Sequence, residues 1–303
     1  MHDLERFNPP TGVAEWLAPG LRRIVANNPS PMTYRGTNTY LIGTGDLALI
    51  DPGPDDPAHL AAILAALEAG ERITHIFVTH SHIDHSPLAA ALSKATGAPV
   101  LAFGDSLAGR SHLMDALAAE GLSGGGEGVD PDFAPDILLS DGQTVTGESW
   151  ALTALHTPGH FGNHLCFAWE DALFCGDLVM GWASSLVSPP DGDLTAFMAS
   201  CAKLQAHDWR IFHSGHGAPI TEPAARLEWL ITHRKSRESQ ILACLGQSPA
   251  TATALTAEIY ADTPKSLLPA AERNVFAHLI DLTERGLVAA KPQLSQGAIF
   301  TAL

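Results

Sequence analysis

The sequence predicts an α/β fold in which helices cover β-sheets from the outside, followed by a small C-terminal domain. Three observations support this prediction. Strand-like and helical runs alternate near the front of the chain, and short strands follow one another as a meander in the middle. From about residue 222, a long helical run leads to two further helices and a closing strand pair, the order of a winged helix. Such alternation is typical of layered sheets with helices on their outer faces.

Local residue patterns predict the individual elements. Short apolar runs rich in β-branched residues predict strands, and longer runs rich in alanine and leucine predict helices. The expected strands span residues 37–43, 47–51, 73–79, 99–103, 143–148, 150–157, 164–169, 172–177 and 210–215. The expected helices span residues 56–70, 87–97, 106–121, 194–207, 222–246, 252–261 and 268–286, before a strand pair at residues 286–290 and 298–303. Residues 44–46 predict a hairpin turn, and the glycine- and proline-rich residues 123–136 predict a surface loop.

Size and charge limit the classes of function. With 303 residues, of which 46% are hydrophobic, the chain predicts one large domain plus a smaller one, each with a packed core. The formal net charge of −16 predicts an acidic surface that repels polyanions, so nucleic acid is not the default partner. A small-molecule substrate is the expected partner instead.

Targeting patterns and cysteines indicate the compartment. The N-terminal stretch MHDLERFNPP has neither a basic region nor an apolar region, so no secretory signal is expected. No uncharged apolar stretch approaches the roughly 20 residues of a membrane span. The four cysteines form no CxxC pair. We therefore expect a cytoplasmic protein with no membrane partner.

The stretch THSHIDHS, residues 79–86, places three histidines and an aspartate directly after a predicted buried strand. His80 and His82 lie two apart on an extended backbone and point the same way, whereas Asp84 and His85 lie beyond the bend. Imidazole nitrogens and carboxylate oxygens are typical ligands of zinc. This one segment therefore predicts ligands for two metal ions.

Four ligands do not fill two metal sites, so further donors are expected downstream. His160 follows a Pro-Gly turn, Asp177 ends a strand, and His216 lies in a glycine-flanked turn after another strand. Loops at one edge of a layered sheet bring such groups together. His164 is a substitute ligand, a neighbour that supports the ligands, or simply the first residue of a strand, and we favour the last two interpretations.

These motifs resemble those of the metallo-β-lactamase superfamily, in the same order along the chain. The resemblance rests on LIDPG, HSHIDH, TPGH, GD and GHG, and it extends from about Asn38 to Gly217. The later stretches HRKSRESQIL and ERNVFAHLIDLTERGLV resemble a subgroup with a C-terminal winged helix, one branch of which includes a mitochondrial endoribonuclease. The resemblance implies an αββα sandwich over residues 1–235 and a winged-helix-like domain over residues 236–303.

The resemblance also implies roles for single residues. One metal would take His80, His82 and His160, the other would take Asp84, His85 and His216, and Asp177 would bridge the two. Asp51, in the LIDPG motif, would orient the ligands from behind. Asp84 and Asp177 are the candidate catalytic residues, because either carboxylate can orient the attacking hydroxide.

Two departures from the family pattern are expected to reshape the substrate cleft without removing a ligand. Pro87 and Leu88 stand where many members have glycines, and Phe161 stands where many have threonine. The loop over residues 181–193 is a further candidate for substrate contact.

Three functions compete on this basis. The favoured one is a hydrolase of a small ester, thioester or lactone that uses a hydroxide bridging two divalent ions. Zinc is expected, with manganese or iron as alternatives, whereas a mononuclear iron oxygenase would use fewer ligands. The second function is an endoribonuclease or phosphodiesterase. The third function is a DNA-binding regulator without catalytic activity. It ranks last because the seven expected metal ligands would then have no role.

Two C-terminal features bear on this choice. The basic run HRKSR, residues 233–237, contacts an anionic substrate or forms a solvated helix face. The winged helix carries few cations on its expected recognition helix. We therefore expect this domain to be architectural or to mediate a homodimer.

Overall fold

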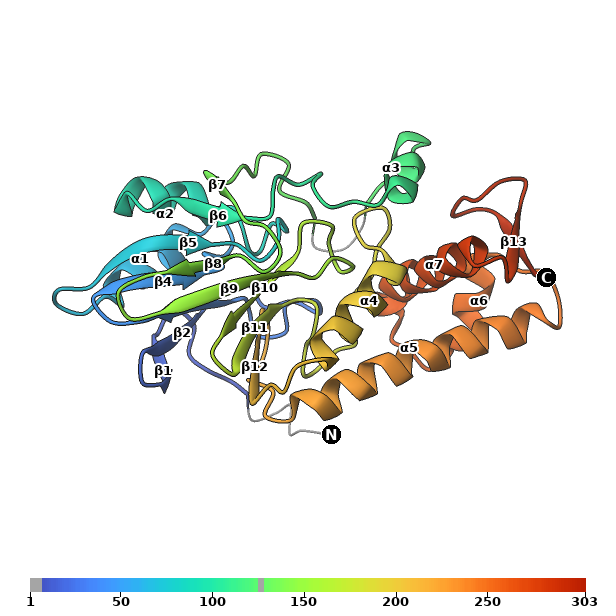
Figure 1. The fold of residues 1–303 in the computed structure, drawn as a ribbon. Coiled ribbons are helices and arrows are strands. Elements are labelled where there is room, and N and C mark those ends of the chain that lie inside the picture. Colours follow the sequence, from blue (N-terminus) through green and yellow to red (C-terminus); the bar gives the residue numbers. More distant parts are fainter. Residues whose placement is uncertain (1–6, 125–127) are drawn as a thin grey trace.

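The computed structural model describes residues 7–124 and 128–303, and Figure 1 shows its arrangement. Two β-sheets lie against each other, helices cover their outer faces, and a helical C-terminal part follows. The predicted αββα arrangement is therefore confirmed. Most of the N-terminal stretch that lacks a leader pattern, and three residues of the loop expected at residues 123–136, lie outside the described residues.

The first sheet has seven strands in the order β1 to β7. They are β1 (Glu15–Ala18), β2 (Leu21–Val25), β3 (Asn38–Ile42), β4 (Asp46–Ile50), β5 (Arg72–Phe77), β6 (Val100–Ala102) and β7 (Ile137–Leu138). Strands β1 to β4 pair antiparallel, with β3 and β4 joined by the expected hairpin, and β4 to β7 pair parallel. Residues 79–86, the histidine-rich stretch, follow the C-terminal end of β5 and so lie where the parallel strands of this sheet end.

The second sheet has five strands in the order β12, β11, β10, β9, β8. They are β8 (Thr144–Thr146), β9 (Ala151–His156), β10 (Leu165–Trp169), β11 (Ala172–Gly176) and β12 (Ile211–Ser214). Strands β11 and β12 run parallel, so the segments that carry Asp177 and His216 leave the sheet at the same edge. The other neighbours pair antiparallel.

Apolar side chains hold the layers together. Between the sheets, Ile50 and Phe77 of the first sheet pack with Leu152, Phe167 and Phe174 of the second. Helices α1 (Pro57–Ala65) and α2 (Leu88–Thr96) cover the first sheet, whereas α4 (Leu194–Gln205) and the start of α5 (Pro223–Leu245) cover the second. Burial of this much apolar surface is the main force that stabilises such a sandwich.

The C-terminal part consists of α6 (Ala252–Ile259), the short 3-10 helix η2 (Lys265–Leu267), α7 (Leu268–Glu284), β13 (Val288–Lys291) and β14 (Ile299–Ala302). This is the helix, helix and hairpin order expected from the sequence. Helix α5 runs unbroken across residue 235, where the two domains were expected to divide. None of the helices among the described residues is long and apolar enough to cross a membrane.

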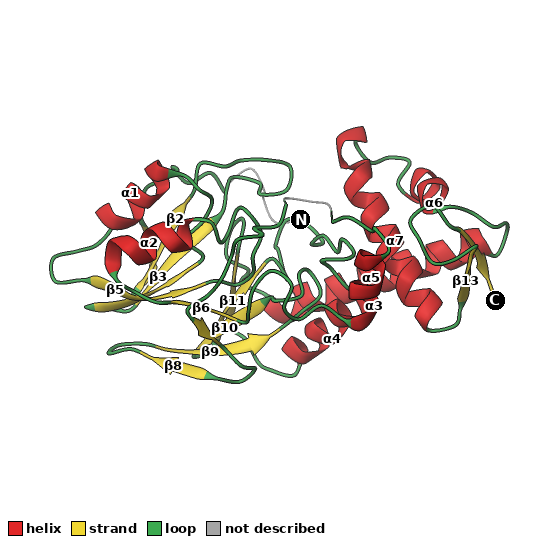
Figure 2. Cartoon of the chain, turned by 90° about the horizontal axis from the view of Figure 1, so that it is seen from above, coloured by secondary structure: helices red, strands yellow, loops and turns green. Residues whose placement is uncertain are grey.

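Two expected helices are shorter than predicted. The helix expected over residues 56–70 ends at Ala65. The pattern predicted a helix over residues 106–121, but α3 begins only at His112 and ends at Ala119. Gly109 has a φ of +77°, and the Ser111 side chain accepts a hydrogen bond from the Met114 N–H, which caps the helix there. Met114 and Leu117 of α3 belong to the same apolar core as Phe276 of α7, and Figure 2 shows α3 beside the C-terminal helices.

Candidate active site

The structure brings all seven predicted ligands together at one edge of the sandwich. Residues 80–85 follow β5, His160 lies in the connection from β9 to β10, Asp177 follows β11, and His216 follows β12. All seven ligand side chains are buried. Two groups of ligand atoms share no residue, and we call them the three-histidine group (His80, His82 and His160) and the aspartate group (Asp84, His85 and His216). A third group, His80, His85 and Asp177, links them.

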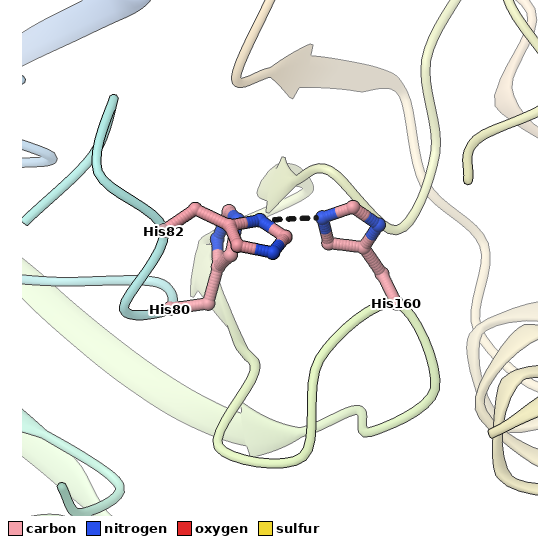
Figure 3. A group of neighbouring side chains, drawn as sticks. All are labelled: His80, His82 and His160. Atoms are coloured by element: carbon pink, nitrogen blue, oxygen red, sulfur yellow. Dashed lines mark hydrogen bonds between the residues drawn. The ribbon is translucent and has the colours of Figure 1, made fainter. Parts of the chain in front are cut away.

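The three-histidine group presents three ring nitrogens to one another (Figure 3). His82 Nδ1 lies 2.9 Å from His80 Nε2 and 3.1 Å from His160 Nε2. Burial, together with the neighbouring His160, lowers the pKa of His82 to about 3. Burial likewise lowers the pKa of His80 and of His160. The rings are therefore neutral, which is the form of imidazole that binds metal.

The aspartate group mixes carboxylate and imidazole donors. Asp84 Oδ2 lies 3.2 Å from His216 Nε2 and 3.4 Å from His85 Nε2. Burial lowers the pKa of His216, but Asp177 and Asp84 outweigh this effect and raise it to about 10. Burial raises the pKa of Asp84, but His85 and His216 hold it well below its usual range. The carboxylate is therefore ionised and available to a cation.

Asp177 lies between the two groups. Its Oδ2 is 3.2 Å from His216 Nε2 and 3.8 Å from His160 Nε2, and its Oδ1 is 3.5 Å from His85 Nε2. One carboxylate thus contacts ligands of both groups, as the bridging role expected from the family resemblance requires. Burial raises the pKa of Asp177, but the histidines His216 and His85 hold it well below its usual range.

The donor set fits divalent cations. Among the described residues, the buried oxygens Asp84 Oδ1 and Asp177 Oδ1 have no hydrogen-bond partner. Leaving an ionised oxygen buried without a partner is costly, and a bound cation removes that cost. His82 Nδ1 faces two other ring nitrogens, although a neutral imidazole carries only one N–H. Both observations indicate lone pairs directed at metal ions.

Asp51 supports the ligands from behind. Its Oδ2 lies 2.9 Å from His85 Nδ1 and accepts a hydrogen bond from Thr79 Oγ1 at 2.8 Å, while its Oδ1 accepts one from the Thr79 N–H at 2.7 Å. The contact to Nδ1 fixes the His85 ring with Nε2 toward the aspartate group. Asp51 has a φ of +53°, a conformation that aspartate tolerates better than most residues.

His164 lies behind Asp177 and not within either ligand group. Its Nε2 accepts a hydrogen bond of 3.3 Å from the Asp177 backbone N–H, and its Nδ1 contacts Thr157 Oγ1 at 3.0 Å. Since Nε2 accepts a hydrogen bond, the ring proton is on Nδ1, and the Nδ1–H donates a hydrogen bond to Thr157 Oγ1. This geometry agrees with a residue that supports a ligand segment.

Several groups that contact the site were not recognised in the sequence, and three of them illustrate why. The Leu186 carbonyl lies 2.7 Å from His160 Nδ1, the Thr37 hydroxyl donates to Asp84 Oδ2 at 3.3 Å, and the Asn163 amide donates to Ser81 Oγ at 2.9 Å. Every residue has a backbone carbonyl, so the identity of residue 186 could not indicate this contact. Asn163 stands in the TPGHFGNH stretch and was recognisable there as a polar residue beside the ligands.

Phe161 corrects one expectation. It was expected to reshape the substrate cleft, but it is fully buried, with its ring centroid 4.8 Å from that of His82. A buried ring supports the ligand from inside the core and presents no surface to a substrate. Cys175, just before the Gly-Asp motif, is also buried and its thiol contacts the Val179 carbonyl, which agrees with a packing role.

Gly215 yields a testable prediction. A Cβ at this position would lie 2.3 Å from Asp177 Oδ1 and 2.7 Å from His85 Cε1. Gly215→Ala should therefore displace both side chains and lower the metal content of the purified chain, as measured by elemental analysis. Overpacking of this kind costs about 1–3 kcal/mol of stability. Gly297→Ala is the matched control, since nothing lies within 4 Å of its Cβ, and equal metal content in the two variants would contradict the prediction.

Comparison with known proteins places this arrangement in a class. Residues 32–216 match the Metallo-beta-lactamase superfamily, and residues 251–296 match the Beta-lactamase associated winged helix domain. The chain belongs to the metallo-beta-lactamase superfamily and is a metal-dependent hydrolase of that class.

Individual relatives cover nearly the whole chain. It is 35% identical over 281 residues to the Beta-lactamase-like protein 2 homolog of Drosophila melanogaster, covering 87% of this chain and 88% of that protein. It is 32% identical over 260 residues to the Atrochrysone carboxyl ACP thioesterase of Claviceps purpurea, covering 82% and 74%. A metallo-beta-lactamase family protein from Thermus thermophilus has a similar structure, with a TM-score of 0.76, 26% identity and coverage of 95% and 100%.

Proposed function

We propose that the chain hydrolyses a small thioester, or a related ester or lactone, with two divalent metal ions. One observation carries the proposal: the Asp177 carboxylate contacts ligands of both the three-histidine group and the aspartate group. A shared carboxylate between two sets of converging donors supports a dinuclear centre. The nitrogen and carboxylate donors favour zinc, with manganese or iron as alternatives.

The protein side of the mechanism follows from the buried carboxylates. When bound, the ions supply a water molecule of lowered pKa and polarise the carbonyl of the substrate. Asp84 Oδ1 and Asp177 Oδ1 have no hydrogen-bond partner among the described residues, so whichever of them does not bind an ion can accept a hydrogen bond from the attacking water and orient it. Asp51 and the Leu186 carbonyl hold the ligand rings in place. Geometry of this kind lowers the barrier mainly by fixing the reacting groups.

Three observations favour an acyl substrate over RNA. A relative that is 32% identical is named as an acyl carrier protein thioesterase. The net charge of −16 opposes a polyanion. Arg234, inside the basic run at residues 233–237, is only 2% exposed and donates to backbone carbonyls, so its charge is not offered to a phosphate backbone. An endoribonuclease or phosphodiesterase is the alternative.

A substrate panel tests the proposal. We expect the purified chain to hydrolyse an acyl thioester such as an acyl-N-acetylcysteamine, to lose this activity with a chelator, and to regain it with zinc. A lactone, a phosphodiester and a single-stranded RNA serve as comparison substrates. RNA cleavage together with binding that weakens steeply with salt, and without thioester turnover, would favour the alternative.

The remaining expectations concern compartment and partners. We propose a cytoplasmic protein, since Cys166, Cys175, Cys201 and Cys244 are all free thiols. We further propose a small molecule as the substrate, no membrane partner, and a homodimer as the assembly. Sedimentation of the purified chain tests the last of these.

A further inference from the structure

The C-terminal domain reaches the metal site through the loop over residues 181–193. Arg234 of α5 and Asn274 of α7 both contact this loop, far along the chain from the ligands. The loop in turn contacts His160, one of the three-histidine group. A continuous set of hydrogen bonds therefore joins the winged-helix part to a metal ligand.

The first contact of this set lies at the ligand itself. His160 Nδ1 lies 2.7 Å from the Leu186 carbonyl, while its Nε2 faces the other histidines of its group. A ring whose Nδ1–H donates to a fixed carbonyl is held in one tautomer and one orientation. The position of the Leu186 carbonyl therefore sets the direction of the His160 ligand atom.

The residues on both sides of Leu186 are fixed by the C-terminal helices. Arg234 Nη2 donates to the Ser185 carbonyl at 2.6 Å and to the Ser184 carbonyl at 2.9 Å. The Val187 N–H donates to Asn274 Oδ1 at 3.1 Å, and the same oxygen accepts from Arg234 Nη1 at 2.7 Å. The two side chains thus hold the loop immediately before and immediately after the carbonyl that binds His160.

The backbone of residues 184–187 includes an unfavourable conformation that surrounding contacts must hold in place. Ser185 has a φ of +60°, an unfavourable conformation for a residue with a side chain. Strained backbone persists only where surrounding contacts determine it, and here the Ser185 carbonyl and hydroxyl are both hydrogen-bonded. The Arg234 guanidinium is buried and its planar fork matches several acceptors at once.

We propose that Arg234 and Asn274 are positioning residues for the metal ligand His160. Through Asn274 of the C-terminal domain and Arg234 of the connecting helix α5, the C-terminal part of the chain sets the geometry of the three-histidine group. Within the described part of the chain, the hydrogen bonds of Arg234 and Asn274 reach the residues on either side of the Leu186 carbonyl, which contacts His160 of the three-histidine group. Ser185 also donates to the Leu178 carbonyl, next to Asp177, so we expect the larger effect, and not the whole effect, at the three-histidine group. This inference rests on the proposed metal centre and not on the identity of the substrate.

Zinc affinity tests the proposal directly. Titration of the metal-free full-length chain against a chromophoric chelator yields two dissociation constants. We expect Asn274→Leu to weaken one constant by about tenfold, the lower end of the effect of losing a group that orients a ligand. The other constant should stay within about twofold of its original value, since the predicted defect is local. Asn274→Asp should bind zinc with the affinity of the parent chain, because aspartate keeps the oxygen that accepts hydrogen bonds from the Val187 N–H and from Arg234.

Arg234→Lys provides a second variant if the leucine variant fails to fold. Lysine keeps the charge but lacks the fork that binds two carbonyls and Asn274 together, so the same constant should weaken. The visible absorption of the cobalt-loaded protein should change in both variants, because it reports the geometry of the ligands and not only the stability of the fold.

Thr195→Val is the matched control. Thr195 Oγ1 donates to Asp281 Oδ1 at 2.6 Å and so links α4 to α7 away from residues 184–187. This variant should lower thermal stability and leave both zinc constants unchanged. Original affinities in folded Asn274→Leu or Arg234→Lys, or an equal loss in Thr195→Val, would overturn the inference. A parent chain that binds no metal would instead overturn the proposed function.

Discussion

Replacing Asp177 by asparagine should reduce turnover on the order of a thousandfold, comparable with the loss of a group that stabilises charge in a transition state. Asp177 lies 3.2 Å from His216 Nε2 and 3.8 Å from His160 Nε2, so the change removes a negative charge that touches both ligand groups. Metal content should fall together with activity. Elemental analysis and steady-state kinetics on the thioester substrate measure the two effects.

Asp171→Asn is the control for this prediction. Asp171 is exposed and pairs with Arg210 on the surface, where ion pairs contribute at most about 1 kcal/mol. Metal content and turnover should both stay at the parent level in this variant. Full turnover by Asp177→Asn after complete metal loss would exclude the proposed metal-dependent mechanism.

Replacing Asp51 by asparagine should weaken metal binding by about 10–100-fold, the usual cost of losing a group that orients a ligand. Asp51 accepts hydrogen bonds from the Thr79 N–H and Oγ1 and contacts His85 Nδ1. An amide offers only one acceptor oxygen, so at least one of these contacts is lost. Asparagine tolerates the φ of +53° as aspartate does, so backbone strain does not explain a defect.

Asp55→Asn separates this effect from the loss of charge alone. Asp55 is exposed and lies further along the same segment, so its replacement should leave metal affinity unchanged. Equal affinities of the Asp51 and Asp55 variants would show that the buried carboxylate does not support His85. Because His85 belongs to the aspartate group, Asp51→Asn and Asn274→Leu should weaken different metal ions.

The structure gives Arg234, within the basic run at residues 233–237, an internal role. Arg234 is buried and holds loop carbonyls, whereas Lys235 is exposed. The run was open to two interpretations, substrate contact or a solvated face, and Arg234 fits neither.

The sequence by itself determined the kinds of ligand and their order along the chain. The spacing of His80, His82, Asp84 and His85 after an apolar strand is a local pattern, and local backbone conformation decides where those side chains point. The two layers and the terminal helices likewise followed from periodicity and turn residues. Where local geometry decides, as at these strand ends, the prediction and the structure agree.

Only the tertiary structure decided which distant groups support the ligands. The Leu186 carbonyl, the Asn274 amide and the buried Arg234 guanidinium act through contacts that no local pattern specifies. Phe161 is buried for the same reason, because burial depends on what packs against a residue and not on its neighbours in sequence. Hydrogen bonds between remote segments form only once the core has brought those segments together, and so they are decided by packing.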